Sequence, residues 1–307
     1  MSQSVRWFMD VAENIFTGMG ARTDPIFNQF IEETGGLEGL DVLSIQLAYG
    51  FAPKPITPRH FIKRTPYANP KAFKQQMDES VGRGWLEAAG EGQYELTGKG
   101  KEVAQRLFAT ADETFGDLES LPDADLKRIV ALLHKVVEKA QGLPEPAKKW
   151  ALSWGSKFDR GPSAPFMVQV RRQLIDLLAY RDDVHIAAWQ PYDVSGHTWE
   201  AFTFAWRGEA GMAPELAEKL SYRNYDEEAY AAALRDLTSR GWIAEEDGRY
   251  VATEKGKKLR QEAEDVTDRY FDAAWVALNE AETEEIKGLL EKLAEAVKPP
   301  EKDPAQE

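Results

Sequence analysis

The sequence predicts a mainly α-helical protein with small β-hairpins, in which one arrangement of elements occurs twice. The first copy is Phe73–Thr97, FKQQMDESVGRGWLEAAGEGQYELT, and the second is Tyr230–Thr253, YAAALRDLTSRGWIAEEDGRYVAT. The tripeptide Arg-Gly-Trp at 83–85 returns 157 residues later at 240–242, whereas Thr97 returns after 156 residues. A register kept over this length indicates an internal repeat in which the second hairpin is one residue shorter.

A helix precedes the hairpin in the first copy. Phe73, Met77 and Val81 have the spacing of an apolar helical stripe. The helix is predicted to start at Asn69-Pro70, because Asn is a favoured N-cap and Pro suits the first helical position. Gly84 is predicted to end it.

The hairpin and the helix after it complete the arrangement. Trp85-Leu86 begins a short strand, Glu91-Gly92 predicts a tight turn, and Gln93–Leu96 alternates as a second strand. Thr97 is predicted to cap the following helix. A helix, a tight hairpin and a helix in this order form the core of a winged helix-turn-helix.

The run RGWL, a hairpin and then Y-x-L-T-x-K-G-K resembles the MarR-type regulators. These proteins are dimers held together by their terminal helices, with one winged unit in each subunit. The resemblance implies that this chain, with two tandem winged helix-turn-helix units, forms an intramolecular pseudo-dimer on a helical platform. It is then a monomer that acts as a pseudo-dimer, or a homodimer.

The remaining elements follow from periodicity, caps and breakers. In the first half we expect helices at 4–17, 24–34, 37–49, from Pro58, from Pro70, at 98–118 and at 125–141. In the second half we expect helices at 146–158, 165–180, 197–206, from Ala213, from about Tyr225, and up to Val297.

Residues 142–146, GLPEP, form the clearest linker. We therefore predict a first winged unit with platform helices at 1–142 and a second at 143–297. The charged, Pro-rich tail 298–307 is predicted to be disordered.

Composition narrows the function. The net charge of −14 argues against an all-round basic nucleic-acid binder, so any DNA contact needs a local basic patch. No cysteine is present, which fits a cytoplasmic protein and excludes thiolate metal sites. No apolar run is long enough to span a membrane, and the N-terminus lacks a signal-peptide layout.

Gly50–Met77 carries such a basic patch. It contains six basic residues, together with His60, and no acidic residue. The patch covers the second and third helices of the first winged unit, which enter a major groove in helix-turn-helix proteins. Its residues are either DNA contacts or a solvated basic face. The predicted DNA-binding residues are Arg59, Lys63, Arg64, Lys71, Lys74 and Gln75.

The second unit has the opposite charge. Arg207–Asp236 holds four basic and seven acidic residues, and its third helix opens with Asp226-Glu227-Glu228. We expect DNA binding to be asymmetric. Charge reversal at Lys71 and Lys74 should abolish it, whereas reversal at Arg223 and Arg235 should have almost no effect.

A second polar cluster lies in the second half. The pattern R-x-D-x-H-x-A-A at 181–188 and the pattern E-x-x-T-D at 264–268 together resemble a group of uncharacterised actinobacterial helix-turn-helix proteins. Asp24 and Asn28 stand at the corresponding places of the first half. The cluster is either a pocket for a small aromatic or anionic effector, or a buried salt-bridge network. Its candidate residues are Arg181, Asp183, His185, Trp189, Tyr192, Trp206, Glu264 and Asp268.

Catalysis has no support in the sequence. The four histidines have no metal-ligand spacing, and no nucleophile elbow, phosphate loop or dinucleotide motif is present. We expect no enzyme, no cofactor and no metal. The leading hypothesis is a transcriptional regulator that binds duplex DNA through the first unit and is controlled by a small-molecule effector. The alternative is an acidic effector-binding or protein-interaction module that has lost DNA binding.

Overall fold

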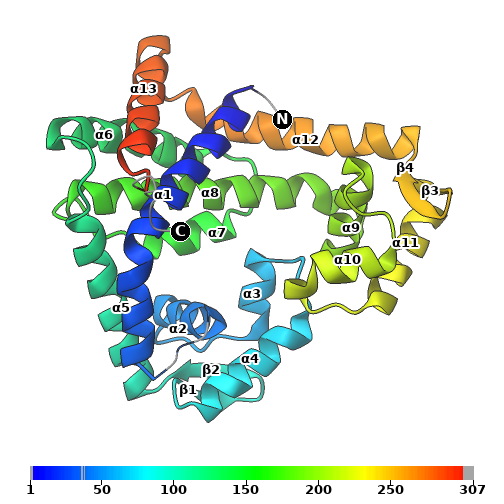
Figure 1. Cartoon of the computed structure of the whole chain (residues 1–307), viewed down its shortest axis with the longest axis horizontal. Helices are drawn as coiled ribbons and strands as arrows, with labels where there is room; N and C mark the ends of the chain where they lie inside the picture. Colours follow the sequence, from blue (N-terminus) through cyan, green and yellow to red (C-terminus); the bar gives the residue numbers. More distant parts are fainter. Residues whose placement is uncertain (1–2, 36, 38, 300–307) are drawn as a thin grey trace, which may run out of the picture. The chain divides into compact units, whose positions relative to one another are not determined.

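The computed structural model describes residues 3–35, 37 and 39–299 as helices joined by short loops, with two small antiparallel hairpins (Figure 1). The first half comprises α1 (Gln3–Glu33), α2 (Gly39–Phe51), α3 (Pro58–Arg64), α4 (Pro70–Gly82), β1 (Leu86–Gly90), β2 (Gln93–Leu96), α5 (Gly98–Gly116) and α6 (Asp123–Gly142). The second half comprises α7 (Trp150–Gly155), η1 (Ser156–Phe158), α8 (Phe166–Trp189), η2 (Gln190–Tyr192), α9 (Gly196–Arg207), α10 (Ala213–Lys219), η3 (Ser221–Arg223), α11 (Glu227–Ser239), β3 (Ile243–Glu246), β4 (Arg249–Ala252), α12 (Glu254–Trp275) and α13 (Glu280–Ala296). The prediction of a mainly helical fold with small hairpins is confirmed.

The order of elements in the first half returns in the second. Three helices, a hairpin and two helices follow one another from α2 to α6 and again from α9 to α13. Helices α4 and α11 both have 13 residues, and their bounds differ by 157. Both begin as the sequence predicts, because the side chains of Asn69 and Asp226 cap the first turn by accepting a backbone N–H.

The two hairpins differ by one residue, and the structure shows where. In β3–β4 every residue is paired, and Asp247-Gly248, both at positive φ, form the two-residue turn. In β1–β2 the pairing passes from Ala88 to Gly90, so Ala89 is an unpaired bulge residue. The change of offset from 157 to 156 is therefore a β-bulge that only the first hairpin contains.

The same junction holds each hairpin to the helix after it. Thr97 Oγ1 donates to the carbonyl of Gly84 (2.7 Å) and accepts from the N–H of Gly100 (2.9 Å). Thr253 makes the equivalent bonds to Gly241 (2.8 Å) and Gly256 (3.1 Å). Because Gly100 has no side chain, its backbone approaches the Trp85 carbonyl so closely that a Cβ would lie 2.0 Å from that oxygen.

Three predicted helix boundaries are wrong. The predicted helix 146–158 begins only at Trp150 and ends in the 3-10 turn Ser156–Phe158. The predicted helices 4–17 and 24–34 form one helix, α1, with Pro25 inside it. The Gly-rich middle of α1 is held by packing: a Cβ on Gly18 would lie 2.5 Å from the Val297 carbonyl oxygen, and Arg22 donates to the carbonyls of Ala296 and Lys298. Helix α8 continues past residue 180 to Trp189, because no Gly or Pro interrupts it.

The chain forms two compact parts, and each draws on both sides of residue 142. The helical part contains the described residues up to Val42, then 101–181, then those from Asp268 onward. The hairpin part contains Leu43–Gly100 and Asp182–Thr267. The compact parts do not divide at residue 142. A boundary there remains a prediction about where one copy of the repeat ends and the next begins.

Aromatic packing and ion pairs hold the helical part together. Phe8 is fully buried against Phe271 and Trp275, with ring centroids 5.5 and 5.4 Å away. Arg128 on α6 forms a two-point ion pair with Glu285 on α13, with nitrogen–oxygen distances of 2.8 and 2.6 Å. Helix α13 also packs along α1.

The hairpin part contains two similar groups of elements. We call α2–α4 with β1–β2 the first head, and α9–α11 with β3–β4 the second head. In the first head Phe61 of α3 stacks on Phe73 of α4 at 4.8 Å. In the second head Trp199 and Trp242 are buried among the apolar residues of α9 to α11. Trp85 and Trp242 are both core residues, as the repeat predicts.

Of the predicted tail 298–307, residues 300–307 lie outside the described residues. No helix within 3–35 or 39–299 combines the length and apolar character that a membrane crossing requires.

We expect Gly100→Ala to destabilise the protein strongly, because its Cβ has no space beside the Trp85 carbonyl. The free energy of unfolding should fall by ~3 kcal/mol in chemical denaturation. Gly82→Ala is the matched control: a Cβ at that position meets nothing within 4 Å, and the substitution should be neutral or stabilise by ~0.5–1 kcal/mol. Equal stability of the two variants would contradict the close approach.

Candidate functional site

The first head exposes basic side chains from two helices. Thr57 precedes α3 and Asn69 precedes α4, so the start of each helix is set locally by its cap. Arg59 and Lys63 are exposed on α3, and Lys71 and Lys74 are exposed on α4. Phe73 and Met77 lie on the buried face of α4, as the stripe predicts.

A groove of about 570 Å³ gathers three of these cations. Arg59, Lys71 and Lys74 line it, and the turn of the hairpin forms the opposite side. Its full lining is Thr57, Pro58, Arg59, Ile62, Pro70, Lys71, Lys74, Glu91, Gly92 and Gln93. Lys63, Arg64 and Gln75 are not among the lining residues.

The cations of the first head differ in their partners. Lys74 pairs with Asp78 (2.7 Å), which also accepts from the Tyr94 hydroxyl (2.6 Å). The hydrogen bond from Lys74, followed by that from Tyr94, lowers the pKa of Asp78. Gln75 donates to Glu79 (3.0 Å), and Arg64 pairs with Asp182. Arg59, Lys63 and Lys71 have no ion pair among the described residues.

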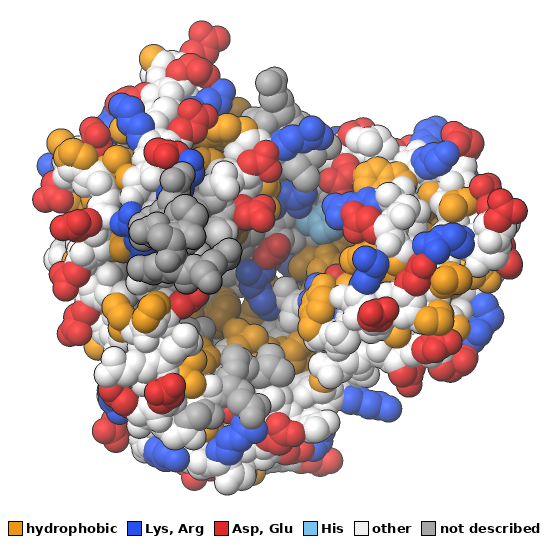
Figure 2. All heavy atoms as spheres, in the orientation of Figure 1, with side chains coloured by type: hydrophobic (Ala, Val, Ile, Leu, Met, Phe, Trp, Pro, Cys, Tyr) orange, Lys and Arg blue, Asp and Glu red, His pale blue; other side chains and the backbone are white. Residues whose placement is uncertain are grey.

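In the second head, arginines are neutralised by neighbouring carboxylates. Arg235 pairs with Glu228 (2.8 Å), and Arg249 forms a two-point pair with Glu215 (2.6 and 2.8 Å). Arg207 lies 3.7 Å from Glu209. On the face drawn in Figure 2, basic and acidic side chains are interspersed over this head. Its surface therefore lacks a concentration of unpaired positive charge.

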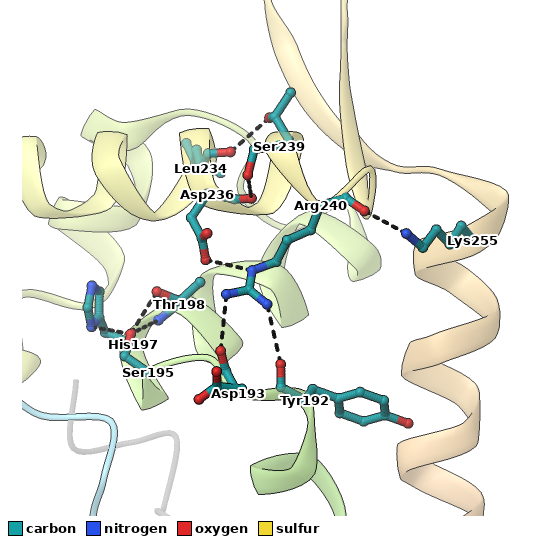
Figure 3. A network of polar contacts seen from close by, with 11 residues as sticks. Tyr192, Asp193, Ser195, His197, Thr198, Leu234, Asp236, Ser239, Arg240 and Lys255 are labelled. Carbon is teal, nitrogen blue, oxygen red and sulfur yellow. Dashed lines mark hydrogen bonds and ion pairs between the residues drawn. The ribbon is translucent and has the colours of Figure 1, made fainter.

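Arg240 shows how a cation in this head is used for structure. Its guanidinium bonds Asp236 (2.9 Å) and the carbonyls of Tyr192 (3.4 Å) and Asp193 (3.1 Å), as Figure 3 shows. Lys255 donates to the carbonyl of Arg240 (2.7 Å). These contacts tie the end of α11 to the segment before α9, so Arg240 is occupied inside the fold.

The turn between α3 and α4, residues 65–69, contacts the second head. We call this the inter-head contact. The N–H of Asn69 donates to the carbonyl of Arg223 (2.8 Å), and the Asn69 side-chain amide donates to the carbonyl of Asn224 (2.8 Å). Gly196 packs so closely on this turn that a Cβ would lie 2.1 Å from the Pro66 carbonyl oxygen.

Aromatic and charged side chains complete the inter-head contact. The indole N–H of Trp189 donates to the hydroxyl of Tyr67 (3.0 Å), and the two rings lie 5.8 Å apart. Burial raises the pKa of Tyr67 well above its usual range. Arg223 pairs with Glu200 (2.7 Å) and lies 5.4 Å from the Tyr67 ring. Arg223 is therefore not a free surface cation, and its replacement by Glu would disturb the inter-head contact as well as the surface charge. The expected effect of this change on DNA binding stays a prediction.

The predicted effector cluster has two groups of contacts. Glu264 pairs with Arg260, whose guanidinium lies 5.0 Å from the rings of both Trp199 and Trp206. His185 Nδ1 lies 3.3 Å from the hydroxyl of Thr267. Burial lowers the pKa of Arg260. Arg260 is 2 % exposed and is the central cation of this group, although the sequence analysis did not single it out.

The aromatic members of the cluster fill space by stacking. Trp199 lies between Trp189 (5.9 Å) and Tyr192 (5.7 Å), nearly parallel to both. Asp183 is 5 % exposed, and Asp268, which belongs to the helical part, is 7 % exposed. Arg181 is partly buried on α8. Within the hairpin part, Glu264, His185 and the aromatic members thus make contacts inside the fold. An effector role for the cluster remains a prediction.

Across 3–35 and 39–299, no group of three or more His, Asp or Glu side chains is placed to hold a metal ion. The sequence also did not identify Tyr67 and Asn69 as contact residues. An aromatic side chain in a turn between two polar helices was the available signal for Tyr67. Asn69 was explained fully by its role as an N-cap.

A family model described as a helix-turn-helix family matches residues 176–301. The second half therefore contains a helix-turn-helix domain. The match includes the whole second head and none of the basic patch of the first. Searches of curated proteins and of solved structures gave no match.

We expect Glu264→Ala to destabilise the hairpin part, because it leaves the buried Arg260 charge without its partner. The loss should be about 3–5 kcal/mol, measured by chemical denaturation. Glu254→Ala, at a carboxylate that is 90 % exposed, should change stability by less than ~0.5 kcal/mol. Wild-type stability of Glu264→Ala would mean that the pair is not part of the structural core.

Proposed function

We propose that this protein is a non-enzymatic transcriptional regulator that binds duplex DNA through the first head. One observation carries the proposal. Arg59, Lys71 and Lys74, from two successive helices, line one open groove beside a hairpin. In a helix-turn-helix protein these helices contact the backbone and enter the major groove. Cations in this place would neutralise phosphates, and Gln75, exposed on α4, would lie toward base edges.

Lys63 and Lys71 strengthen the proposal because neither has an ion pair among the described residues, so no partner has to be displaced on binding. Lys74 must exchange Asp78 for a phosphate. We leave Arg64 out of the proposed contacts, because its pair with Asp182 holds it inside the hairpin part. With Arg59 and Lys54, up to five phosphate contacts are available, which corresponds to a salt slope of roughly −4.5.

We further propose that the two heads are winged units of the MarR type, related by duplication. The equal spacing of α4 and α11 supports this, as does the Thr–Gly junction that follows both hairpins. Two contacts join residues that are 157 apart: Arg128 with Glu285, and the Tyr225 hydroxyl with the carbonyl of Ala68 (3.5 Å). A residue that touches its own equivalent lies near a pseudo-two-fold axis.

The inter-head contact restricts how DNA is bound. A helix with its side chains is about 10–12 Å across and fills a major groove about 12 Å wide. The second head is hydrogen-bonded to Asn69 at the N-terminal end of α4, so the groove walls have no space there. We propose that this contact opens when DNA binds.

The second candidate is an acidic protein-interaction module. The net charge of −14 and the paired arginines of the second head favour it. The two candidates differ in one measurement: the regulator binds random duplex DNA at low salt, whereas the module does not.

We expect Lys71→Glu/Lys74→Glu to weaken binding to duplex DNA by ~100-fold or more, because two phosphate contacts become repulsive. Fluorescence anisotropy with a labelled duplex at several salt concentrations would measure this. Arg235→Glu is the control, because Arg235 is an exposed, paired cation of the second head. The affinity of this variant for duplex DNA should stay within about twofold of the wild-type affinity. Equal losses in both would contradict binding through the first head.

Gly196→Ala should act as a wedge in the inter-head contact. Its Cβ would meet the Pro66 carbonyl, so the closed form is disfavoured and more molecules can bind DNA. We expect the affinity for duplex DNA to rise on the order of tenfold. Gly288→Ala, where a Cβ meets nothing within 4 Å, should leave the affinity unchanged. A loss of affinity in a folded Gly196→Ala protein would show that the closed form is the one that binds.

A further inference from the structure

The helical part contains a cavity of about 430 Å³ that is separate from the basic groove and from the Arg260 cluster. Three elements line it, and it is open to solvent, because Ala131, His134, Glu138 and Asp159 are exposed. Helix α6 contributes one face, including Ala131, His134 and Glu138. Helix α8 contributes a second face, and residues 156–162 form the third side. The volume lies within the usual range for small-molecule sites, about 300–1,000 Å³.

A buried ion pair forms one wall of the cavity. Arg172 and Asp176, one turn apart on α8, are bonded at 2.6 Å, and their side chains are 14 % and 6 % exposed. The backbone of α7 lies directly against them: a Cβ on Gly155 would be 2.7 Å from Asp176 Oδ1. Burial raises the pKa of Asp176 to about 6, and the neighbouring Arg172 guanidinium opposes that shift.

Side chains also organise the loop that lines the cavity. Asp159 accepts from the N–H of Gly161 (2.9 Å). The amide nitrogen of Gln169 donates to the carbonyls of Pro162 (3.3 Å) and Ala164 (2.7 Å), which leaves its oxygen as an acceptor. Gln173 Oε1 is buried and has no hydrogen-bond partner among the described residues. If the Gln173 amide rotated toward the cavity, its oxygen could accept a hydrogen bond from an N–H group of a bound ligand.

The lining is acidic and contains no Phe, Tyr or Trp side chain. Glu138, Asp159 and Asp176 contribute three carboxylates, and Arg172 is the one guanidinium among the lining residues. His134 lies 3.6 Å from Glu138 at the edge of α6. Apolar contact comes from aliphatic side chains such as Val130 and Val137. Excess negative charge and many acceptors favour a ligand with a positive charge and several N–H donors.

We propose that this cavity binds a small aliphatic organic cation, of the chemical class of the diamines and polyamines. The ammonium groups would be held by Glu138 and Asp159, and the methylene chain would lie along Val130 and Val137. This site is distinct from the effector cluster predicted from the sequence, and the ligand class differs from the aromatic or anionic one expected there. The proposal does not depend on DNA binding.

Isothermal titration calorimetry with putrescine and spermidine tests whether amines bind in this cavity. The buffer contains about 150 mM salt, because salt screens the general attraction of a cation to an acidic protein. The neutral isostere 1,4-butanediol is the ligand control. We expect one site per chain for an amine and no detectable heat for the diol. Saturable binding of the diol with the same affinity would overturn the charge argument, and no binding of either amine at millimolar concentration would overturn the site.

Variants locate the binding. Glu138→Gln/Asp159→Asn should weaken amine binding at least tenfold, and Ala131→Phe should block the cavity without changing the charge. Glu245→Gln/Glu246→Gln removes the same charge from exposed residues of β3 and should have no effect. Equal weakening by both charge variants, or unchanged binding in Ala131→Phe, would place the amine elsewhere and overturn the proposal. Duplex binding by Glu138→Gln/Asp159→Asn is measured in parallel, so that failure of this site is distinguished from failure of the first head to bind DNA.

Discussion

The contact of a glycine backbone with a tryptophan carbonyl is the constraint on which both heads depend. Gly100 meets the carbonyl of Trp85, and Gly256 meets that of Trp242 in the same way. A threonine three residues before each glycine bonds both sides of the junction. This contact fixes the first residues of α5 and α12 against the hairpins.

Two heads built on the same constraint have different surfaces. The backbone geometry depends on buried residues and glycines, whereas charge depends on exposed positions that the fold leaves free to vary. The face that carries Lys71 and Lys74 in α4 carries Glu228 and Ala231 in α11 at the same spacing. The family match falls on the second head, and the basic groove lies in the first. Fold and charge therefore have to be assessed separately for each half.

The inter-head contact places different side chains of the two heads in different environments. Residues of one helix-turn-helix turn are hydrogen-bonded to the backbone of the other head, and Tyr67 and Arg223 are partly or largely withdrawn from solvent. Arginine suits this contact, because its planar guanidinium group can pair with the Glu200 carboxylate and at the same time lie near the Tyr67 ring. The second head thus contributes by holding the first, whatever else it binds.

The sequence by itself determined what depends on near neighbours. The caps at Asn69 and Thr97, the tight turn at Glu91-Gly92 and the apolar stripe of α4 all follow from residues a few positions apart, and they occur where they were predicted. The tertiary structure alone decided which charges are free. Arg64 pairs with Asp182 across 118 residues, and Arg223 is paired with Glu200 beside the Tyr67 ring. Local patterns cannot specify these partners, because a charged side chain pairs with whichever opposite charge the folded chain brings within reach.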